Sequence, residues 1–155
     1  MTTGPDEVPG IVAPPPLLYA VPLALGIYLQ HVRPQALLPA GAGRLIGIIL
    51  VAFGFIGMAG VLAFRRAGTS PNPWRPTTSL VLTGPYRWTR NPMYVGMTLL
   101  YLGTTAWVNT VWPLIPLPFI LLVMQRGVIA REEAYLDARF GDDYRSYKGK
   151  VRRWI

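Results

Sequence analysis

Two short clusters of polar residues, at positions 84–96 and 132–133, contain the side chains of this sequence that are best suited to chemistry. The first reads GPYRWTRNPMYVG, in a chain that is 52% hydrophobic and 14% charged. Its glycine-proline pair is a turn signal, and its asparagine-proline pair sets the start of a helix. A helix N-terminus presents free N–H groups to an anionic group, and Arg87 and Arg90 add positive charge.

Three aromatic side chains in the same stretch, Tyr86, Trp88 and Tyr94, offer flat surfaces on which a ring can stack. The stretch therefore suits a ligand that combines an aromatic ring with a charged group. From the residues alone, an ordinary loop at a membrane surface, with arginines reaching toward lipid headgroups, is an equally good interpretation.

The second cluster is the glutamate pair Glu132-Glu133. Neighbouring helix residues point about 100° apart, so two adjacent carboxylates seldom serve one site. We expect one glutamate to pair with an arginine such as Arg131 or Arg87, and the other to face a ligand. The alternative is a solvated helix face.

The composition indicates what surrounds these clusters. Soluble domains carry roughly 25% charged residues, so a content of 14% indicates lipid around much of the surface. The net charge of +8 is concentrated in clusters beside apolar runs, which favours cytoplasmic loops near anionic lipid over a nucleic-acid partner. The chain has no cysteine and one histidine, so we expect no thiolate or histidine-rich metal site and no disulfide.

Apolar runs predict the helices that position the clusters. Residues 45–64 carry no charge over 20 positions, about 30 Å of helix, which matches the hydrocarbon core of a bilayer. The glycines of this run would let another helix approach closely. Residues 17–29 form a shorter apolar run. Residues 93–124 are too long for one crossing and contain breakers near Asn109, so we expect helices at 93–108 and 111–130.

These runs predict an all-α integral membrane protein with about four transmembrane helices, the last two forming a tight hairpin. Residues 1–16 are expected to be a flexible N-terminal tail and residues 17–130 the transmembrane bundle. Residues 131–155 are expected to form an amphipathic cytosolic helical segment, with a break at Gly141, that completes the pocket. The basic loop and tail place both termini in the cytoplasm.

The clusters resemble those of a known family. The motif Gly-Pro-Tyr-Arg at 84–87 is followed by Arg-Asn-Pro-Met-Tyr-Val-Gly at 90–96, and Glu132-Glu133 precedes Leu136, Phe140-Gly141, Tyr144, Tyr147 and Val151. This combination resembles the integral-membrane methyltransferases of the isoprenylcysteine carboxyl methyltransferase type and the related phospholipid N-methyltransferases. The resemblance covers residues 80–155, about half of the chain.

The resemblance implies that S-adenosylmethionine is the cofactor, held between the loop before the third span and the C-terminal segment. The implied cofactor-binding residues are Thr83, Gly84, Pro85, Tyr86, Arg90, Asn91, Pro92, Tyr94, Gly96, Glu132 and Glu133. The residues expected to act on the substrate are Arg131, Arg126 and Glu133. Asn91 stands where the family usually has histidine, and an asparagine can hydrogen-bond but cannot titrate.

The implied activity is methyl transfer to a lipophilic substrate, with a carboxylate as the favoured acceptor, because it is ionised at neutral pH and needs no base. N-methylation of a phospholipid amine is the main alternative and would need a base such as Glu132 or Glu133. Two alternatives come from other classes of protein. One is a membrane sterol reductase that uses a nicotinamide cofactor, and the other is a non-catalytic membrane scaffold that binds anionic lipid. The expected partners are a lipophilic substrate and membrane lipids.

Overall fold

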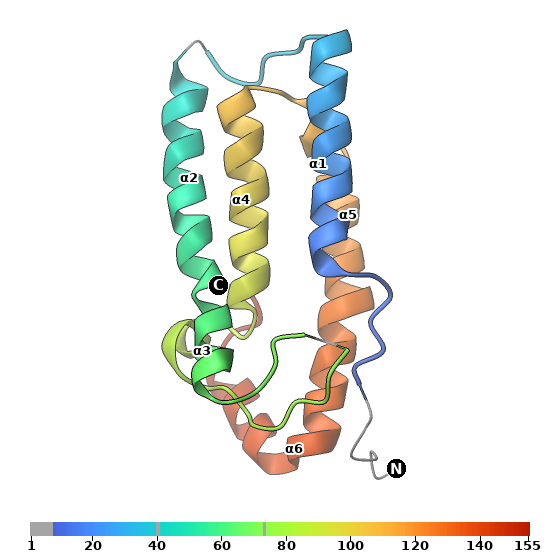
Figure 1. The fold of residues 1–155 in the computed structure, drawn as a ribbon, viewed down its shortest axis with the longest axis vertical. Coiled ribbons are helices and arrows are strands. Elements are labelled where there is room, and N and C mark those ends of the chain that lie inside the picture. The colour runs from blue at the N-terminus through green and yellow to red at the C-terminus, as the bar shows by residue number, and fades with distance from the viewer. Residues whose placement is uncertain (1–7, 40, 73) are drawn as a thin grey trace.

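Helices form the framework of the protein in its computed structural model, which describes residues 8–39, 41–72 and 74–155. In chain order the elements are α1 (Pro15–Val32), α2 (Ala42–Met58), α3 (Gly60–Arg66), the 3₁₀ turn η1 (Gly84–Arg87), α4 (Pro92–Val108), the 3₁₀ turn η2 (Trp112–Leu114), α5 (Leu117–Val123), the π-helical segment η3 (Met124–Ile129) and α6 (Ala130–Lys150). In Figure 1, α1, α2, α4 and α5 run along the long axis and α6 crosses one end.

Helices α2 and α4 touch through their glycines, which confirms the predicted close approach of another helix to the glycines of residues 45–64. A Cβ atom added to Gly57 would lie 2.6 Å from the Cα atom of Gly96, and one added to Gly47 would lie 2.7 Å from the backbone nitrogen of Trp107. Small residues let two helix backbones approach within van der Waals contact, which is a common way to pack helices in lipid. We call this contact the glycine seam.

On its other side, α4 packs against α1, α5 and η3 through larger side chains. Tyr101 is almost fully buried there, and its hydroxyl donates a hydrogen bond of 2.6 Å to the carbonyl oxygen of Pro113. The Tyr19 and Thr98 hydroxyls lie 2.8 Å apart and link α1 to α4. The core cluster consists of Tyr19, Tyr94, Tyr101, Ile120, Met124, Val128 and Ile129.

The turn after α4 confirms the predicted break near the middle of the long apolar run. Asn109 adopts a left-handed conformation (φ 54°, ψ 56°) that ends the helix, and asparagine tolerates it better than most residues. Its side-chain oxygen accepts hydrogen bonds from the N–H groups of Leu37 and Leu38. Asn109 therefore also fixes the segment between α1 and α2.

Two helical runs, Ala42–Arg66 and Trp112–Lys150, are long and apolar enough to cross a membrane. Large apolar side chains on them face outward, including Phe53, Phe55 and Phe119, each more than half exposed. Such surfaces are what a lipid environment requires. The all-helical expectation is confirmed for the described residues, whereas the number of four crossings remains a prediction.

Two boundaries differ from the sequence expectation. The run at 45–64 is interrupted at Ala59, between α2 and α3. Helix α1 begins at Pro15, inside the expected tail of residues 1–16, and the Val12 N–H donates to the Gly127 carbonyl oxygen. Residues 1–7 of that tail lie outside the described residues. The expected break at Gly141 is present, with φ 52° and ψ −124° inside α6.

Candidate functional site

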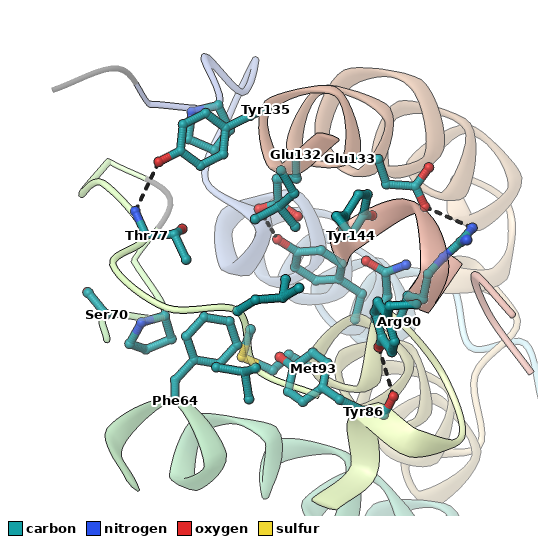
Figure 2. Close-up of a pocket in the computed structure, with 18 of the residues that line it drawn as sticks. Phe64, Ser70, Thr77, Tyr86, Arg90, Met93, Glu132, Glu133, Tyr135 and Tyr144 are labelled. Carbon is teal, nitrogen blue, oxygen red and sulfur yellow. Dashed lines mark hydrogen bonds and ion pairs between the residues drawn. The ribbon is translucent and has the colours of Figure 1, made fainter. Parts of the chain in front are cut away.

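A polar pocket lies between the loop that joins α3 to α4, the start of α4, and helix α6 (Figure 2). It contains about 780 Å³ of non-atom space, part of which is open to solvent. Six of the residues expected at a binding site line it: Tyr86, Arg90, Asn91, Tyr94, Glu132 and Glu133. The two distant polar clusters of the sequence therefore meet at one place.

The first cluster reaches the pocket through two local structures. Gly84 has φ +62°, a conformation that favours glycine, and it starts the 3₁₀ turn η1 that buries Tyr86. The Tyr86 carbonyl oxygen accepts a hydrogen bond of 2.8 Å from the Tyr147 hydroxyl of α6. Pro92 then occupies the first turn of α4, where its missing N–H costs no hydrogen bond.

Glu133 is buried and paired with two arginines. Nη2 of Arg90 lies 3.0 Å from Glu133 Oε1, and the Arg153 guanidinium donates to both carboxylate oxygens, with its Nε 3.0 Å from Oε1. The hydrogen bond to Glu133 raises the pKa of Arg153 above its ordinary value. Two cations around one buried carboxylate make a clamp that joins the loop before α4, α6 and the C-terminal segment.

Glu132 lies in a different environment although it is the next residue. Its Oε1 accepts a hydrogen bond of 2.7 Å from the Tyr94 hydroxyl, and it makes no ion pair among the described residues. It belongs to α6, where charged residues replace the apolar part of the Trp112–Lys150 run, so it lies outside the membrane-spanning part. Burial, with a smaller contribution from the Glu133 charge, raises the pKa of the Glu132 carboxyl to about 7.

This geometry is consistent with the expectation that the two glutamates serve different purposes. The arginines that pair with Glu133 are not the expected ones. Arg90 and Arg153 hold Glu133, whereas the expected partners were Arg131 or Arg87. Figure 2 shows the two carboxylates pointing apart, Glu133 toward the arginine side and Glu132 over the pocket. The 100° offset of adjacent helical side chains produces this division.

One nitrogen atom of the Arg90 guanidinium has no hydrogen-bond partner among the described residues. Its Nη1 donates to the Lys148 carbonyl oxygen at 3.0 Å and its Nη2 pairs with Glu133, but its Nε is buried without a hydrogen-bond partner in the described part of the chain. A buried N–H without an acceptor is unfavourable by about 1–3 kcal/mol. Among residues 8–39, 41–72 and 74–155, the pocket therefore holds one donor without an acceptor and one carboxylate without a cation.

Asn91 anchors the end of the chain. Its Nδ2 donates to the Arg153 carbonyl oxygen at 2.8 Å, and the Thr89 hydroxyl donates to the same oxygen at 3.1 Å. The Arg90 N–H donates to the Arg152 carbonyl oxygen at 2.9 Å. Asparagine at this position thus makes a hydrogen bond that needs no titratable group, and it places Arg153 beside Glu133.

Several expected site residues lie away from the pocket walls. Arg126 is exposed on η3, and Arg131 is exposed with its Nη1 donating to the Gly10 carbonyl oxygen at 2.6 Å. Gly96 faces the glycine seam, where an added Cβ would lie 2.8 Å from the Gly54 carbonyl oxygen. Thr83, Gly84, Pro85 and Pro92 shape the turn and the start of α4 without lining the pocket.

Several residues that complete the pocket were not among the predicted site residues. Tyr135 contacts the segment of residues 74–83, because its hydroxyl oxygen accepts a hydrogen bond of 3.0 Å from the Thr77 N–H. The wall of the pocket also contains the apolar and aromatic side chains of Phe64, Met93 and Tyr144. The helical spacing of the tyrosines along α6 was visible in the sequence. The loop that contacts them has no comparable sequence pattern that would predict this contact.

A second, apolar groove lies between α4 and α5. It contains about 1000 Å³ of non-atom space, much of it open, and the chain's last residues close one side. Trp154 lies in its wall, and the indole N–H donates a hydrogen bond of 2.8 Å to Oε1 of Gln125. The residues that line it are Val95, Thr98, Leu99, Pro118, Leu121, Leu122, Gln125, Trp154 and Ile155.

Comparison with known proteins agrees with the resemblance carried by the two clusters. A family model described as phospholipid methyltransferase matches residues 43–143. The chain is 43% identical over 63 residues to an uncharacterized protein of Haemophilus influenzae, a match that covers 41% of this chain and 100% of that protein. It is 36% identical over 72 residues to the protein-S-isoprenylcysteine O-methyltransferase of Schizosaccharomyces pombe, which covers 46% of this chain and only 30% of that protein.

No solved structure matches the chain significantly. The family model nevertheless includes the glycine seam, the 84–96 motif and the glutamate pair, which are the features that build the polar pocket. Because that match extends over more than half of the sequence, the chain belongs to the phospholipid methyltransferase family, and it is distantly related to an isoprenylcysteine O-methyltransferase.

Proposed function

We propose that this protein is an S-adenosylmethionine-dependent membrane methyltransferase that binds its cofactor in the polar pocket and methylates a lipophilic acceptor in the α4–α5 groove. The observation that carries the proposal is the pair of incomplete interactions in the pocket. Nε of Arg90 lacks an acceptor and Glu132 lacks a cation among the described residues. A ligand with both an anionic oxygen and a cationic centre would complete both interactions.

S-adenosylmethionine fits this requirement. Its amino-acid part offers a carboxylate to the Arg90 N–H, and its ammonium and sulfonium are cations that Glu132 would attract. Tyr86 and Tyr144 in the wall offer faces for the adenine ring.

The groove is suited to an acyl or prenyl chain, because most of its lining is aliphatic. It adjoins the polar pocket along the chain where Val95 follows Tyr94, and Trp154 follows Arg153, which pairs with the pocket residue Glu133. An acceptor lying in the groove from the lipid side would thus have its head beside the cofactor. The basic residues at this end of the bundle, such as Arg65 and Arg66, favour a cytoplasmic orientation for the pocket and the C-terminal segment.

When bound, S-adenosylmethionine supplies an electrophilic methyl group on a sulfonium. The residues of the chain align the acceptor with that group and exclude water, and alignment supplies much of the acceleration of a displacement reaction. A carboxylate acceptor is the first candidate, supported by the similarity to the S. pombe O-methyltransferase. It requires no base, and with Arg126 and Arg131 outside the pocket it would be oriented by other donors.

An amine acceptor is the second candidate, and Glu132 favours it. An ammonium must lose its proton before its nitrogen can attack a methyl group, and a carboxyl with a pKa of about 7 is matched to that transfer at neutral pH. Glu132 would take the proton on the oxygen that Tyr94 does not occupy. The family name, phospholipid methyltransferase, is consistent with such a substrate.

One experiment tests both candidates. Purified protein in liposomes is given methyl-labelled S-adenosylmethionine with either N-acetyl-S-farnesylcysteine or phosphatidylethanolamine, and the lipid product is then treated with base. Base releases the label of a methyl ester as volatile methanol, whereas an N-methyl label stays on the headgroup nitrogen and is not volatile. Lys150→Gln, an exposed substitution at the end of α6, is the control. A folded protein that neither labels a lipid nor binds the cofactor would contradict the proposal and favour the scaffold alternative.

A further inference from the structure

The apolar groove contains one polar side chain whose hydrogen bonds are only half used. Three of its lining residues have polar side chains: Thr98, Gln125 and Trp154. Thr98 is occupied, because its hydroxyl donates to the Tyr94 carbonyl oxygen at 2.8 Å and lies 2.8 Å from the Tyr19 hydroxyl. Trp154 uses its single donor on Gln125. Gln125 is thus the residue that can still interact with a ligand.

The direction of the Gln125 amide follows from the chemistry of its partner. An indole N–H only donates, so the atom that faces Trp154 must be the amide oxygen. The amide nitrogen then points elsewhere with two N–H donors, and it makes no hydrogen bond within the part of the chain that the structure describes. Because Gln125 lines the groove, these donors are available to a molecule that occupies it.

The backbone at Gln125 is also unusual. The π-helical segment η3 begins at Met124, and its wider turn buries Met124 and Val128 completely in the core while Gln125 remains at the groove. π-helical turns are rare and are found frequently at functional sites. Gln125 lies seven residues before Glu132 on the same helical run, so about 10 Å separates them along the axis.

We infer that Gln125 is a specificity-determining residue that donates a hydrogen bond to an anionic oxygen in the head of the acceptor lipid, a carboxylate or a phosphate. Trp154 is a positioning residue that acts by holding the Gln125 oxygen. The inference rests on the proposed methyltransferase function. A hydrogen bond from an amide to an ionised oxygen is stronger than one between neutral groups, and the apolar walls strengthen it further.

Gln125→Glu separates recognition from structure. The new carboxylate still accepts the Trp154 N–H, so the contact between η3 and the C-terminal segment is kept, but both donors are lost and a charge repels an anionic head. We expect KM to rise roughly 10- to 100-fold for whichever lipid, N-acetyl-S-farnesylcysteine or phosphatidylethanolamine, the native protein methylates. The affinity for S-adenosylhomocysteine should be unchanged. Gln125→Met, which lacks donors and charge, should show a smaller rise in KM.

The matched control is Gln30→Glu at the far end of α1. Gln30 also uses its side-chain oxygen as an acceptor, from the Gln35 N–H at 3.0 Å, so the same substitution keeps that bond and adds the same charge. KM should not change in this variant. An unchanged KM in Gln125→Glu, or an equal rise in both variants, would overturn the inference.

A readout without turnover separates failure of this inference from failure of the proposed function. In protein labelled with ¹⁵N-tryptophan, the indole signal of Trp154 is assigned by its loss in Trp154→Phe. Adding N-acetyl-S-farnesylcysteine, or in a second sample short-chain phosphatidylethanolamine, should shift that signal in the native protein and much less in Gln125→Glu. A shift without methyl transfer would contradict the proposed function while supporting this site. No shift with either lipid, or equal shifts in both proteins, would overturn the inference.

Discussion

One face of helix α4 and the residues just before its start are held by opposite means. Toward α2 the contact is the glycine seam, in which backbones touch and no charge takes part, as at Gly57 and Gly96. At its start, α4 meets α6 and the C-terminal segment through the clamp of Arg90, Glu133 and Arg153. The small size of glycine determines the first contact, and the attraction between charged side chains determines the second.

This difference indicates how one short helix combines a bundle with a binding site. A seam of small residues packs well in lipid, where burial of apolar surface gives no advantage, and it leaves no room for a ligand. A contact made by long side chains leaves space between backbones, and the pocket occupies that space. If this division is correct, substitutions in the clamp should affect stability most, followed by substitutions in the seam, at Glu132 and at Arg131.

Removal of the clamp should have the largest effect. Glu133→Ala leaves Arg90 and Arg153 without their common anion, and breaking a buried ion pair usually costs about 3–5 kcal/mol. Thermal unfolding in detergent measures the loss. Asp137→Ala breaks an exposed ion pair on the same helix, with Arg145, and should reduce the unfolding temperature far less. Equal losses in the two variants would show that the clamp is not the stabilising contact.

The seam should be the next most sensitive region. Gly96→Ala adds a methyl group where the Gly54 carbonyl oxygen is only 2.8 Å away, and such overpacking costs about 1–3 kcal/mol. Gly149→Ala is the control, because nothing lies within 4 Å of a Cβ at that position and alanine favours helix. If the Gly96→Ala variant has the same unfolding temperature as the native protein, the helices are not in close contact there.

Glu132 should produce a pH dependence. Its carboxyl has a pKa of about 7 in the folded protein against an ordinary value of 4.5, so between these pH values the unfolded chain loses a proton that the folded protein keeps. Stability therefore decreases as the pH rises from about 4.5 to about 7. Glu132→Gln, which keeps an acceptor for Tyr94, should remove this decrease. Parallel pH curves of unfolding temperature for the two proteins would contradict the assignment.

Arg131→Ala should have the smallest effect. Arg131 is exposed, and among the described residues its side chain donates to the Gly10 carbonyl oxygen without lining the pocket. The unfolding temperature and KM for the acceptor should both stay close to the native values. A large rise in KM would restore the role that the sequence suggested for this arginine and would mean that the N-terminal segment moves during binding.

The sequence was sufficient for features that depend on local signals. Apolar length predicted the helices, Asn109 the turn and Gly141 the kink, because each is decided by the residues of its own segment. Partners across the fold were harder to predict. The role of Arg153 depends on how the chain's last residues pass beside Asn91, a contact 62 positions apart with no local pattern. The groove and Gln125 were missed because both arise only where α4, η3 and Trp154 meet.

The central claim is that the polar pocket holds S-adenosylmethionine through Arg90 and Glu132, and titration calorimetry of S-adenosylhomocysteine tests it most directly. The native protein should bind one molecule per chain. Arg90→Lys, which keeps the positive charge beside Glu133 but lacks the Nε–H, should bind it at least about ten-fold more weakly. A folded native protein that binds no S-adenosylhomocysteine, or that binds a nicotinamide nucleotide instead, would contradict the account.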